Sequence, residues 1–188
     1  MTQIRWTVRD LDLFPDPIDD TRYEIIGGEL HVSHQPHWRH QLVTSRTHVA
    51  VAVWSEETGS GYVLEAPGVI FSQDDAVAPD LVWVAAHRFA LVAADDGKLH
   101  LAPDLVVEVL SPGRANETRD REIKLDVYSR YGVREYWIVS WEDHSVQVSR
   151  REVQQLQTVA TLTIEETLTS PMLPGFALPL RRLFAPPL

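Results

Sequence analysis

The stretch from residue 104 to residue 140 constrains the fold of this chain most strongly. Residues 104–110 are apolar and β-branched on both faces, which is typical of a central strand covered from both sides. A helical pattern follows over 117–131, Gly132 is placed to cap it in the left-handed conformation, and EYWIVS at 135–140 predicts a second strand. Two strands joined by a helix form a parallel, right-handed β–α–β unit, so the sequence predicts an α/β fold.

The segments before this unit predict further strands and a long helix. Residues 7–20 favour a short helix or an extended arm. Gly27 and Gly28 separate two short strand patterns and predict an N-terminal hairpin, because glycine adopts positive φ readily. Residues 37–57 predict a helix with an apolar stripe, and strands are expected after it. The stripe consists of Trp38, Leu42, Val49 and Val53, and the strands are expected at about 61–66, 68–72 and 79–84.

The C-terminal part of the chain predicts a β-ribbon over 144–169, followed by a proline-rich tail. Four apolar residues of the tail are expected to pack over the core: Phe176, Leu180, Leu183 and Phe184. Together with the β–α–β unit, these elements predict a mixed β-sheet flanked by helices.

The composition is that of a globular protein. The chain has 188 residues, 44% of them hydrophobic and 23% charged, which favours one domain over 1–188. No apolar run is long enough for a membrane span, and the lack of a signal-peptide pattern and of cysteine favours a cytoplasmic location. The formal net charge of −10 argues against a wide nucleic-acid-binding surface, but it allows a nuclease with a local basic rim.

Glu108 is the first candidate functional residue, because it stands inside the apolar strand. A carboxylate in such a strand costs several kcal/mol unless it is paired or binds a metal. Two interpretations follow from the residues alone. Glu108 belongs to a site, or it forms a purely structural ion pair with Lys124 or Arg121.

Two aspartates that follow prolines are candidate partners for Glu108. Asp104 precedes it by four residues on the same strand, a separation of about 13 Å, which is too far for two ligands of one metal ion. Asp80 begins a different strand, and neighbouring strands would bring the two carboxylates to about 5 Å. Asp80 is therefore the better candidate and Asp104 is expected at a strand entrance, although Asp80 could also be a turn residue after Pro79.

A polar stripe on the following helix could complete the site. Asp120, Lys124 and Tyr128 recur every four residues, so they share one helix face. Asp120 and Lys124 also have the favourable order for a helical ion pair, so this face could simply be solvated. Tyr128 could orient the Lys124 ammonium, or it could belong to the core.

In combination, these motifs resemble the Uma2 (DUF820) family of the PD-(D/E)XK, restriction-endonuclease-like superfamily. The resemblance covers residues 20–184 and is specific as a combination, whereas the Pro-Asp dipeptides alone are weak signals. It rests on YEIIGGEL, APDLVWV, PDLVVEVLSP, D-x3-K-x3-Y, YGVREYWIV and LPGF. It implies a restriction-endonuclease-like α/β core with the N-terminal hairpin and the C-terminal β-ribbon added.

The resemblance also implies roles for individual residues. Asp80 takes the superfamily's Pro-Asp position and Glu108 its (D/E) position, and these two would be the metal ligands. The lysine expected at position 110 is a leucine here, so the amine would come from Lys124. Glu24 matches an early acidic position and would add a carboxylate, unless it is a surface residue of the hairpin. His40 matches the family's helix histidine and would border the cleft, near Asp120 and Tyr128.

The function implied is that of an endonuclease that uses Mg²⁺ or Mn²⁺ to hydrolyse phosphodiester bonds. Nucleic acid, and DNA in particular, is the expected partner. A homodimer would supply the two sites needed to cut two strands. The alternative, favoured by the acidic net charge, is a non-catalytic interaction module that keeps the nuclease fold.

A run of four histidines supports a third reading, a histidine-based metalloenzyme. His31, His34, His37 and His40 recur every three residues, and imidazole suits Zn²⁺ or Ni²⁺. The change from strand to helix around Pro36 prevents one continuous face. Only His37 and His40 could therefore share a face.

Overall fold

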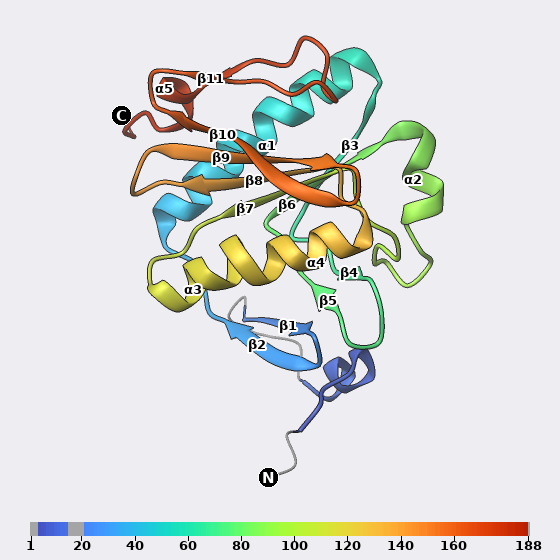
Figure 1. Cartoon of the computed structure of the whole chain (residues 1–188). Helices are drawn as coiled ribbons and strands as arrows, with labels where there is room; N and C mark the ends of the chain where they lie inside the picture. Colours follow the sequence, from blue (N-terminus) through green and yellow to red (C-terminus); the bar gives the residue numbers. More distant parts are fainter. Residues whose placement is uncertain (1–3, 15–20, 188) are drawn as a thin grey trace.

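A mixed six-stranded sheet forms the centre of the structure, a computed structural model that describes residues 4–14 and 21–187 (Figure 1). Its strand order is β10-β9-β8-β7-β6-β3, and only β7 and β8 run parallel. The strands are β3 (Gly61–Glu65), β6 (Leu81–Ala85), β7 (Leu105–Val109), β8 (Glu135–Ser140), β9 (Ser145–Glu152) and β10 (Gln155–Thr163). The predicted mixed sheet and the parallel pair around residues 104–140 are therefore confirmed.

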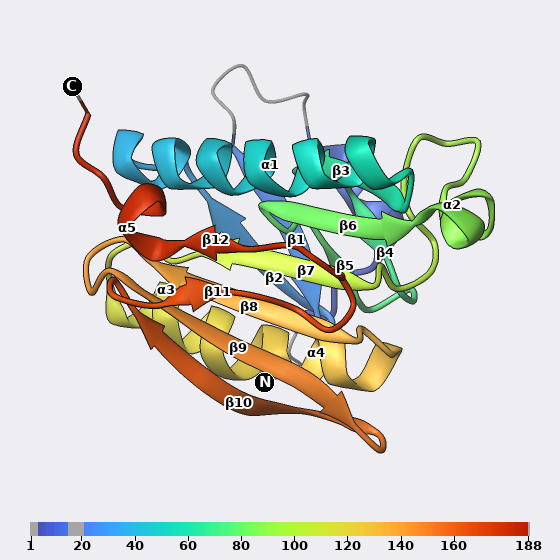
Figure 2. The same cartoon turned by 90° about the horizontal axis from the view of Figure 1, so that it is seen from above.

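Helices cover both faces of this sheet, with α1 (Trp38–Thr58) on one side and the helix over 114–131 on the other (Figure 2). The short helix α2 (Ala86–Val92) follows β6. Alternate residues of each strand point to opposite faces, so Val107 belongs to the core cluster under α1 and Val106 to the other cluster. Glu108 has the parity of Val106 and faces the helix over 114–131.

That helix contains one irregular turn between its two α-helical parts, α3 (Arg114–Thr118) and α4 (Lys124–Tyr131). The turn η2 (Arg119–Ile123) is π-helical, and the backbone N–H of Lys124 bonds to the carbonyl of Arg119, five residues earlier. Gly132 ends α4 with φ 94°, as predicted. The sequence predicts this helix but not the π turn, which widens it by one residue.

A small second sheet contains the predicted N-terminal hairpin. Its order is β2-β1-β5-β4, and Gly27 and Gly28 form the turn with φ of 60° and 80°. The strands are β1 (Arg22–Ile26), β2 (Glu29–Ser33), β4 (Val69–Ile70) and β5 (Ala76–Val77). Before it lies a 3-10 helix, η1 (Val8–Leu13), while residues 15–20 of the expected helix or arm lie outside the described residues. This sheet brings β1 next to α4 and the end of β6.

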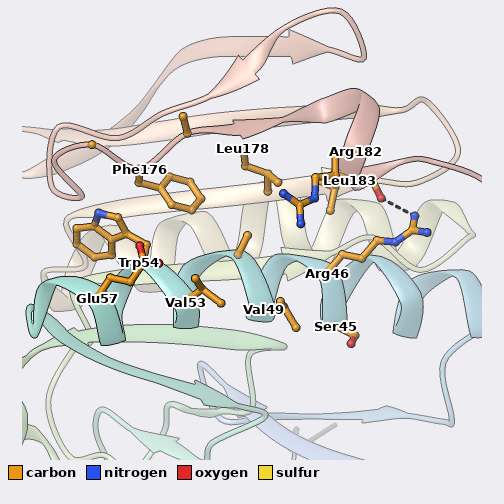
Figure 3. A pocket seen from close by; sticks show the side chains of 13 residues that line it. Ser45, Arg46, Val49, Val53, Trp54, Glu57, Phe176, Leu178, Arg182 and Leu183 are labelled. Atoms are coloured by element: carbon orange, nitrogen blue, oxygen red, sulfur yellow. Dashed lines mark hydrogen bonds between the residues drawn. The ribbon is translucent and has the colours of Figure 1, made fainter.

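The C-terminal segment closes the core on the side of α1. The predicted ribbon is β9 and β10, and the tail then forms β11 (Thr167–Leu168), β12 (Leu178–Pro179) and α5 (Leu180–Leu183). The four apolar residues expected to pack over the core are all buried: Phe176, Leu180, Leu183 and Phe184. Arg46 of α1 donates a hydrogen bond to the carbonyl of Leu183 (Figure 3) and another to the carbonyl of Ala185, and these bonds attach the tail to the helix.

The apolar stripe predicted for α1 does not face the core. Trp38, Val49 and Val53 are 53%, 55% and 48% exposed. Val49 and Val53 border a cavity of about 510 Å³ between α1 and the C-terminal segment (Figure 3). No helix in the described parts of the chain, α1 included, is both long and apolar enough to cross a membrane.

The face of α1 that does pack on the sheet is partly polar. Its buried residues are His40, Val43, Thr44, Thr47, Val51, Trp54 and Ser55. Thr44 and Thr47 bond to backbone carbonyls one turn earlier, and the Ser55 hydroxyl accepts from the indole N–H of Trp83. Because these hydroxyls are satisfied, they can be buried without a large cost.

Candidate active site

Glu108 lies almost completely buried on β7, where the helix over 114–131 crosses the sheet. Its Oε1 accepts a hydrogen bond from Nζ of Lys124 at 2.8 Å and from the hydroxyl of Tyr128 at 2.7 Å. Lys124 and Tyr128 lie one turn apart in α4, so both reach the same oxygen. Tyr128 thus positions the carboxylate that the ammonium contacts. Arg121, the other predicted partner, bonds to Gln147 instead.

Asp80 lies beside Glu108 because it immediately precedes β6, the antiparallel neighbour of β7. Leu81 pairs with Val107, which places the two acidic residues one position further along the same ladder. Asp80 Oδ1 accepts from Arg22 at 2.7 Å, while Oδ2 accepts from the backbone N–H of Val109 at 2.8 Å. The predicted adjacency of the two strands is confirmed, and Asp80 is not a simple turn residue.

His40 of α1 completes the surroundings of Asp80, with Nε2 3.0 Å from Oδ2. Burial alone would raise the pKa of Asp80. The contacts with His40, Arg22 and the N–H of Val109 outweigh burial and hold the pKa well below its ordinary value. Asp80 is therefore a carboxylate held in a fixed orientation from three directions.

Glu24, on β1, shares the Lys124 ammonium with Glu108. Its Oε1 lies 2.9 Å from Nζ of Lys124 and accepts from the N–H of Ala78 at 2.8 Å. Glu24 is buried, so the alternative of a hairpin surface residue is wrong. Burial opposes its charge, but Lys124 and the N–H of Ala78 lower the pKa of Glu24 below its ordinary value.

The pKa of Glu108 moves in the opposite direction and rises to about 8. Burial is the largest cause, and the negative charges of Asp80, Asp120 and Glu24 add to it, whereas Lys124 opposes the rise. Glu108 is therefore a carboxyl group that can exchange a proton near neutral pH, and the pKa of Asp120 is also raised, mainly by burial.

Lys124 is held as an ammonium by its three acidic neighbours. Burial would lower its pKa, but Glu108, Glu24 and Asp120 raise the pKa above its ordinary value. Asp120 lies 3.9 Å from Nζ, and its Oδ1 accepts from Nε of Arg119 at 3.1 Å. Asp120, Lys124 and Tyr128 are 1%, 2% and 0% exposed, so the interpretation of this helix face as solvated is wrong.

These side chains line a narrow cleft of about 40 Å³. Its lining includes four carboxylates and three positively charged side chains, and His40 lies beside them. The carboxylates are Glu24, Asp80, Glu108 and Asp120, and the cations are Arg22, Arg119 and Lys124. Six of the seven predicted site residues line the cleft, and Tyr128 lies behind Glu108.

Arg22 and Arg119 are cleft residues that the sequence interpretation missed. Arg22 precedes Glu24 by two residues on β1, so strand alternation alone places the two on one face. Arg119 is next to Asp120, and its Nη1 also donates to Ser33 at 2.9 Å, which joins the helix to β2. Nothing in the sequence indicates this second contact, because it depends on the packing of the hairpin.

Asp104 lies at the other end of β7 and takes no part in the cleft. It is fully buried, and Oδ2 accepts from the N–H of Ala85 at 3.0 Å. Arg88 and Arg134 lie 2.7 and 3.2 Å from its Oδ1. The expectation that Asp104 occupies a strand entrance, away from the site, is confirmed.

The four histidines do not converge. His31 lies opposite Glu24 in the hairpin, and His37 caps α1 and stacks on Trp141, with ring centres 5.2 Å apart. His34 lines the cleft, and His40 faces Asp80. In residues 4–14 and 21–187, no group of three or more His, Asp or Glu side chains is arranged to hold a metal ion. His37 and His40, the two that could have shared a helix face, have different partners, Trp141 and Asp80.

The cleft nevertheless fits a magnesium site of the simplest kind. Mg²⁺ is usually held by one or two carboxylates and keeps several water ligands, so it does not need a cage of three side chains. Asp80 and Glu108 offer two carboxylates from adjacent strands. Burial is the largest cause of the raised pKa of Glu108, and a cation would offset the further contribution of the negative charges of Asp80, Asp120 and Glu24.

Comparison with known proteins gives two results. The family model described as "Uma2: Putative restriction endonuclease" matches residues 10–181. The structure is similar to the crystal structure of a putative nuclease belonging to DUF820 from Anabaena variabilis ATCC 29413. That likeness has a TM-score of 0.76 and 17% sequence identity, and it covers 95% of this chain and 97% of that one. No curated protein matches this chain.

Proposed function

The chain belongs to the Uma2 family and has a restriction-endonuclease-like fold, and from this premise we propose that it is a metal-dependent nuclease that hydrolyses phosphodiester bonds in DNA. One observation carries the proposal. Asp80, Glu108 and Lys124 come from three separate segments, yet they line a single cleft, with Lys124 2.8 Å from Glu108. Two carboxylates and an amine are the groups that metal-assisted phosphodiester hydrolysis requires.

Asp80 and Glu108 would hold Mg²⁺ or Mn²⁺ through their carboxylate oxygens. The bound ion would polarise the scissile phosphate and lower the pKa of a coordinated water. Arg22 and the N–H of Val109 keep the Asp80 carboxylate in place, and Tyr128 does the same for Glu108. Both ligands are thus oriented before substrate arrives, which favours catalysis.

Lys124 acts as a fixed positive charge in this proposal. Its raised pKa makes it a poor base, so it orients water by hydrogen bonding and offsets negative charge on the pentavalent transition state. Glu24 and Asp120 hold the ammonium in position. Arg22 and Arg119 lie in the same cleft and offer guanidinium groups to a phosphate.

The test is cleavage of plasmid and oligonucleotide DNA with Mg²⁺ or Mn²⁺. We expect cleavage by the wild-type protein and none by Glu108→Ala or Lys124→Ala. Asp126→Asn is the matched control, because Asp126 lies on the same helix, is 67% exposed and is absent from the cleft. Equal cleavage by all four proteins would indicate a contaminating nuclease and would contradict the proposal.

A specific observation also favours the alternative, a non-catalytic interaction module. The cleft carboxylates already have protein cations as partners: Arg22 contacts Asp80, and Lys124 contacts both Glu24 and Glu108. Thermal unfolding with and without Mg²⁺ separates the two functions. A melting temperature that rises with Mg²⁺ in the wild type but not in Glu108→Ala supports the metal site, and no rise in either favours the module.

A further inference from the structure

The N-terminal end of α1 presents an aromatic and cationic patch outside the cleft. The patch consists of His37, Trp38, Arg39 and Trp141. Trp38 is 53% exposed, and the guanidinium carbon of Arg39 lies 5.2 Å from the centre of the Trp38 ring and 5.5 Å from that of Trp141. His37 stacks on Trp141 with an angle of 12° between the rings. The rings therefore hold Arg39 in place by cation–π contacts.

A cavity of about 300 Å³ adjoins this patch, and none of the described residues that line it is acidic. Its walls include Trp38, Arg39 and Trp141, together with Arg46 and His144. The whole chain has 27 acidic residues against 17 basic ones, so a cavity bordered only by cationic, aromatic, aliphatic and histidine side chains departs from the average surface. Its charge suits an anionic ligand that also carries flat apolar groups.

The patch follows the catalytic cleft directly along the chain. His34, Pro36 and His40 line the cleft, while Trp38 and Arg39 line the cavity. One strand of nucleic acid could therefore have a phosphate in the cleft and a neighbouring nucleotide at the patch. Arg46 is already engaged with the carbonyls of the C-terminal segment, which leaves Arg39 as the arginine directed at such a strand.

We propose that this patch is a base-stacking subsite, and that the protein acts on an unpaired strand of nucleic acid in preference to an intact duplex. The inference rests on the proposed nuclease function and adds a substrate class to it. A base can stack on Trp38 only if its face is open, which is true of an unpaired nucleotide and not of a base inside a duplex. Each base–aromatic stack contributes about 1–3 kcal/mol and tolerates any sequence. Cutting one strand requires only one site, so this substrate does not call for a homodimer.

The test is binding in EDTA, which separates affinity from cleavage. Fluorescence anisotropy is measured with a labelled 12-nucleotide single strand and with a hairpin duplex of the same sequence. We expect the wild type to bind the single strand more tightly than the duplex. Trp38→Ala should weaken single-strand binding by about 5- to 150-fold, corresponding to one lost stack. Trp38→Phe should restore part of the affinity, and Arg39→Ala should weaken binding and reduce its salt dependence.

Val49→Ala is the matched control, because Val49 is equally exposed on the same helix but lines the other cavity. It should bind as the wild type does. Equal affinity of the wild type for both oligonucleotides, or unchanged single-strand binding by Trp38→Ala, overturns the inference even if the protein cuts DNA. Conversely, Trp38-dependent binding by a protein that never cleaves supports the subsite and contradicts the nuclease function.

Discussion

Strand β7 carries a buried carboxylate at each end, and the two ends differ in their balance of charge. Around Asp104, one carboxylate meets two arginines and a backbone N–H. Around Glu108, four carboxylates and three positively charged side chains line one cleft. Burial is therefore common to both ends, whereas unmatched negative charge and access to a cleft occur only at Glu108. The comparison favours a structural role for Asp104, and under the proposed function Glu108 takes part in the chemistry.

The largest expected effect separates the two ends by activity. Glu108→Gln keeps the shape of the side chain but removes the charge of the proposed metal ligand, and we expect DNA cleavage to fall by at least about 100-fold. Asp104→Asn should leave the cleavage rate of the folded protein within about threefold, because no cleft residue contacts Asp104. Steady-state cleavage assays with Mg²⁺ measure both. Similar losses in the two variants would contradict the comparison.

The second effect concerns the free energy of unfolding, and here Asp104→Asn should be the more damaging of the two substitutions. Asp104→Asn loses charge-assisted hydrogen bonds in a fully buried position, so the free energy of unfolding should fall by about 2–3 kcal/mol. Glu108→Gln should increase the stability at pH 9, because it removes an ionised group that its surroundings disfavour. Urea denaturation at pH 9 gives both values. A stable Asp104→Asn protein would show that the arginine pair is dispensable.

The third effect is a dependence of stability on pH that arises from Glu108. The pKa of Glu108 is about 8 in the folded protein, whereas its ordinary value is 4.5. The folded state therefore keeps this proton up to a higher pH than the unfolded state does. Stability should therefore fall as pH rises from 4.5, with the loss complete above about 8. Thermal unfolding between pH 5 and 9 should show a smaller fall in Glu108→Gln than in the wild type. Equal slopes in both would exclude Glu108 as the source.

Mg²⁺ affinity should also depend on the ionisation of Glu108, but it should rise over the pH range in which stability falls. Metal binding requires the carboxylate form of Glu108, so affinity should rise with pH by up to about tenfold per unit until pH 8 and then level off. Titration calorimetry at several pH values measures this directly. An affinity that is constant from pH 6 to 9 would argue against Glu108 as a ligand.

The smallest effect tests the support that Tyr128 gives to Glu108. Tyr128→Phe removes the hydroxyl that donates to Oε1 at 2.7 Å, and this bond favours the ionised carboxylate. The pH midpoint of Mg²⁺ binding should consequently move upward by up to about one unit. If the pH midpoint of Mg²⁺ binding does not change, Tyr128 contributes only to packing in the core.

The two long helices show which parts of this molecule the sequence could predict. The repeat of Asp120, Lys124 and Tyr128 was predicted to share one helix face, and all three side chains do point toward Glu108 or its neighbours. The apolar stripe on α1 does not mark the buried face of the helix, because apolar character alone does not determine which face is buried. Thr44 and Thr47 can be buried when their hydroxyls bond to the helix backbone.

The pairing of Asp80 with Glu108 could be predicted once two strands were expected, since their neighbourhood makes the distance short. The contribution of Arg22 depends on a hairpin that belongs to a different sheet. Its contact with Asp80 spans 58 residues, and local patterns carry no information about such a contact. Long-range packing of this kind is the part of the site that the sequence alone left open.

The π turn at Arg119–Ile123 has a consequence for insertions and deletions. A π turn is equivalent to one extra residue in an α-helix, and one residue corresponds to a rotation of about 100°. Deleting one residue of the turn that does not line the cleft would convert the π turn into an ordinary α turn, so Lys124 and Tyr128 would still face Glu108, whereas inserting a further residue would rotate them away by about 100°. The hydroxyl of Tyr136 donates to the carbonyl of Asp120 within the turn and connects this position to the sheet. The rotation of the helix at this turn therefore limits which insertions and deletions leave the cleft complete.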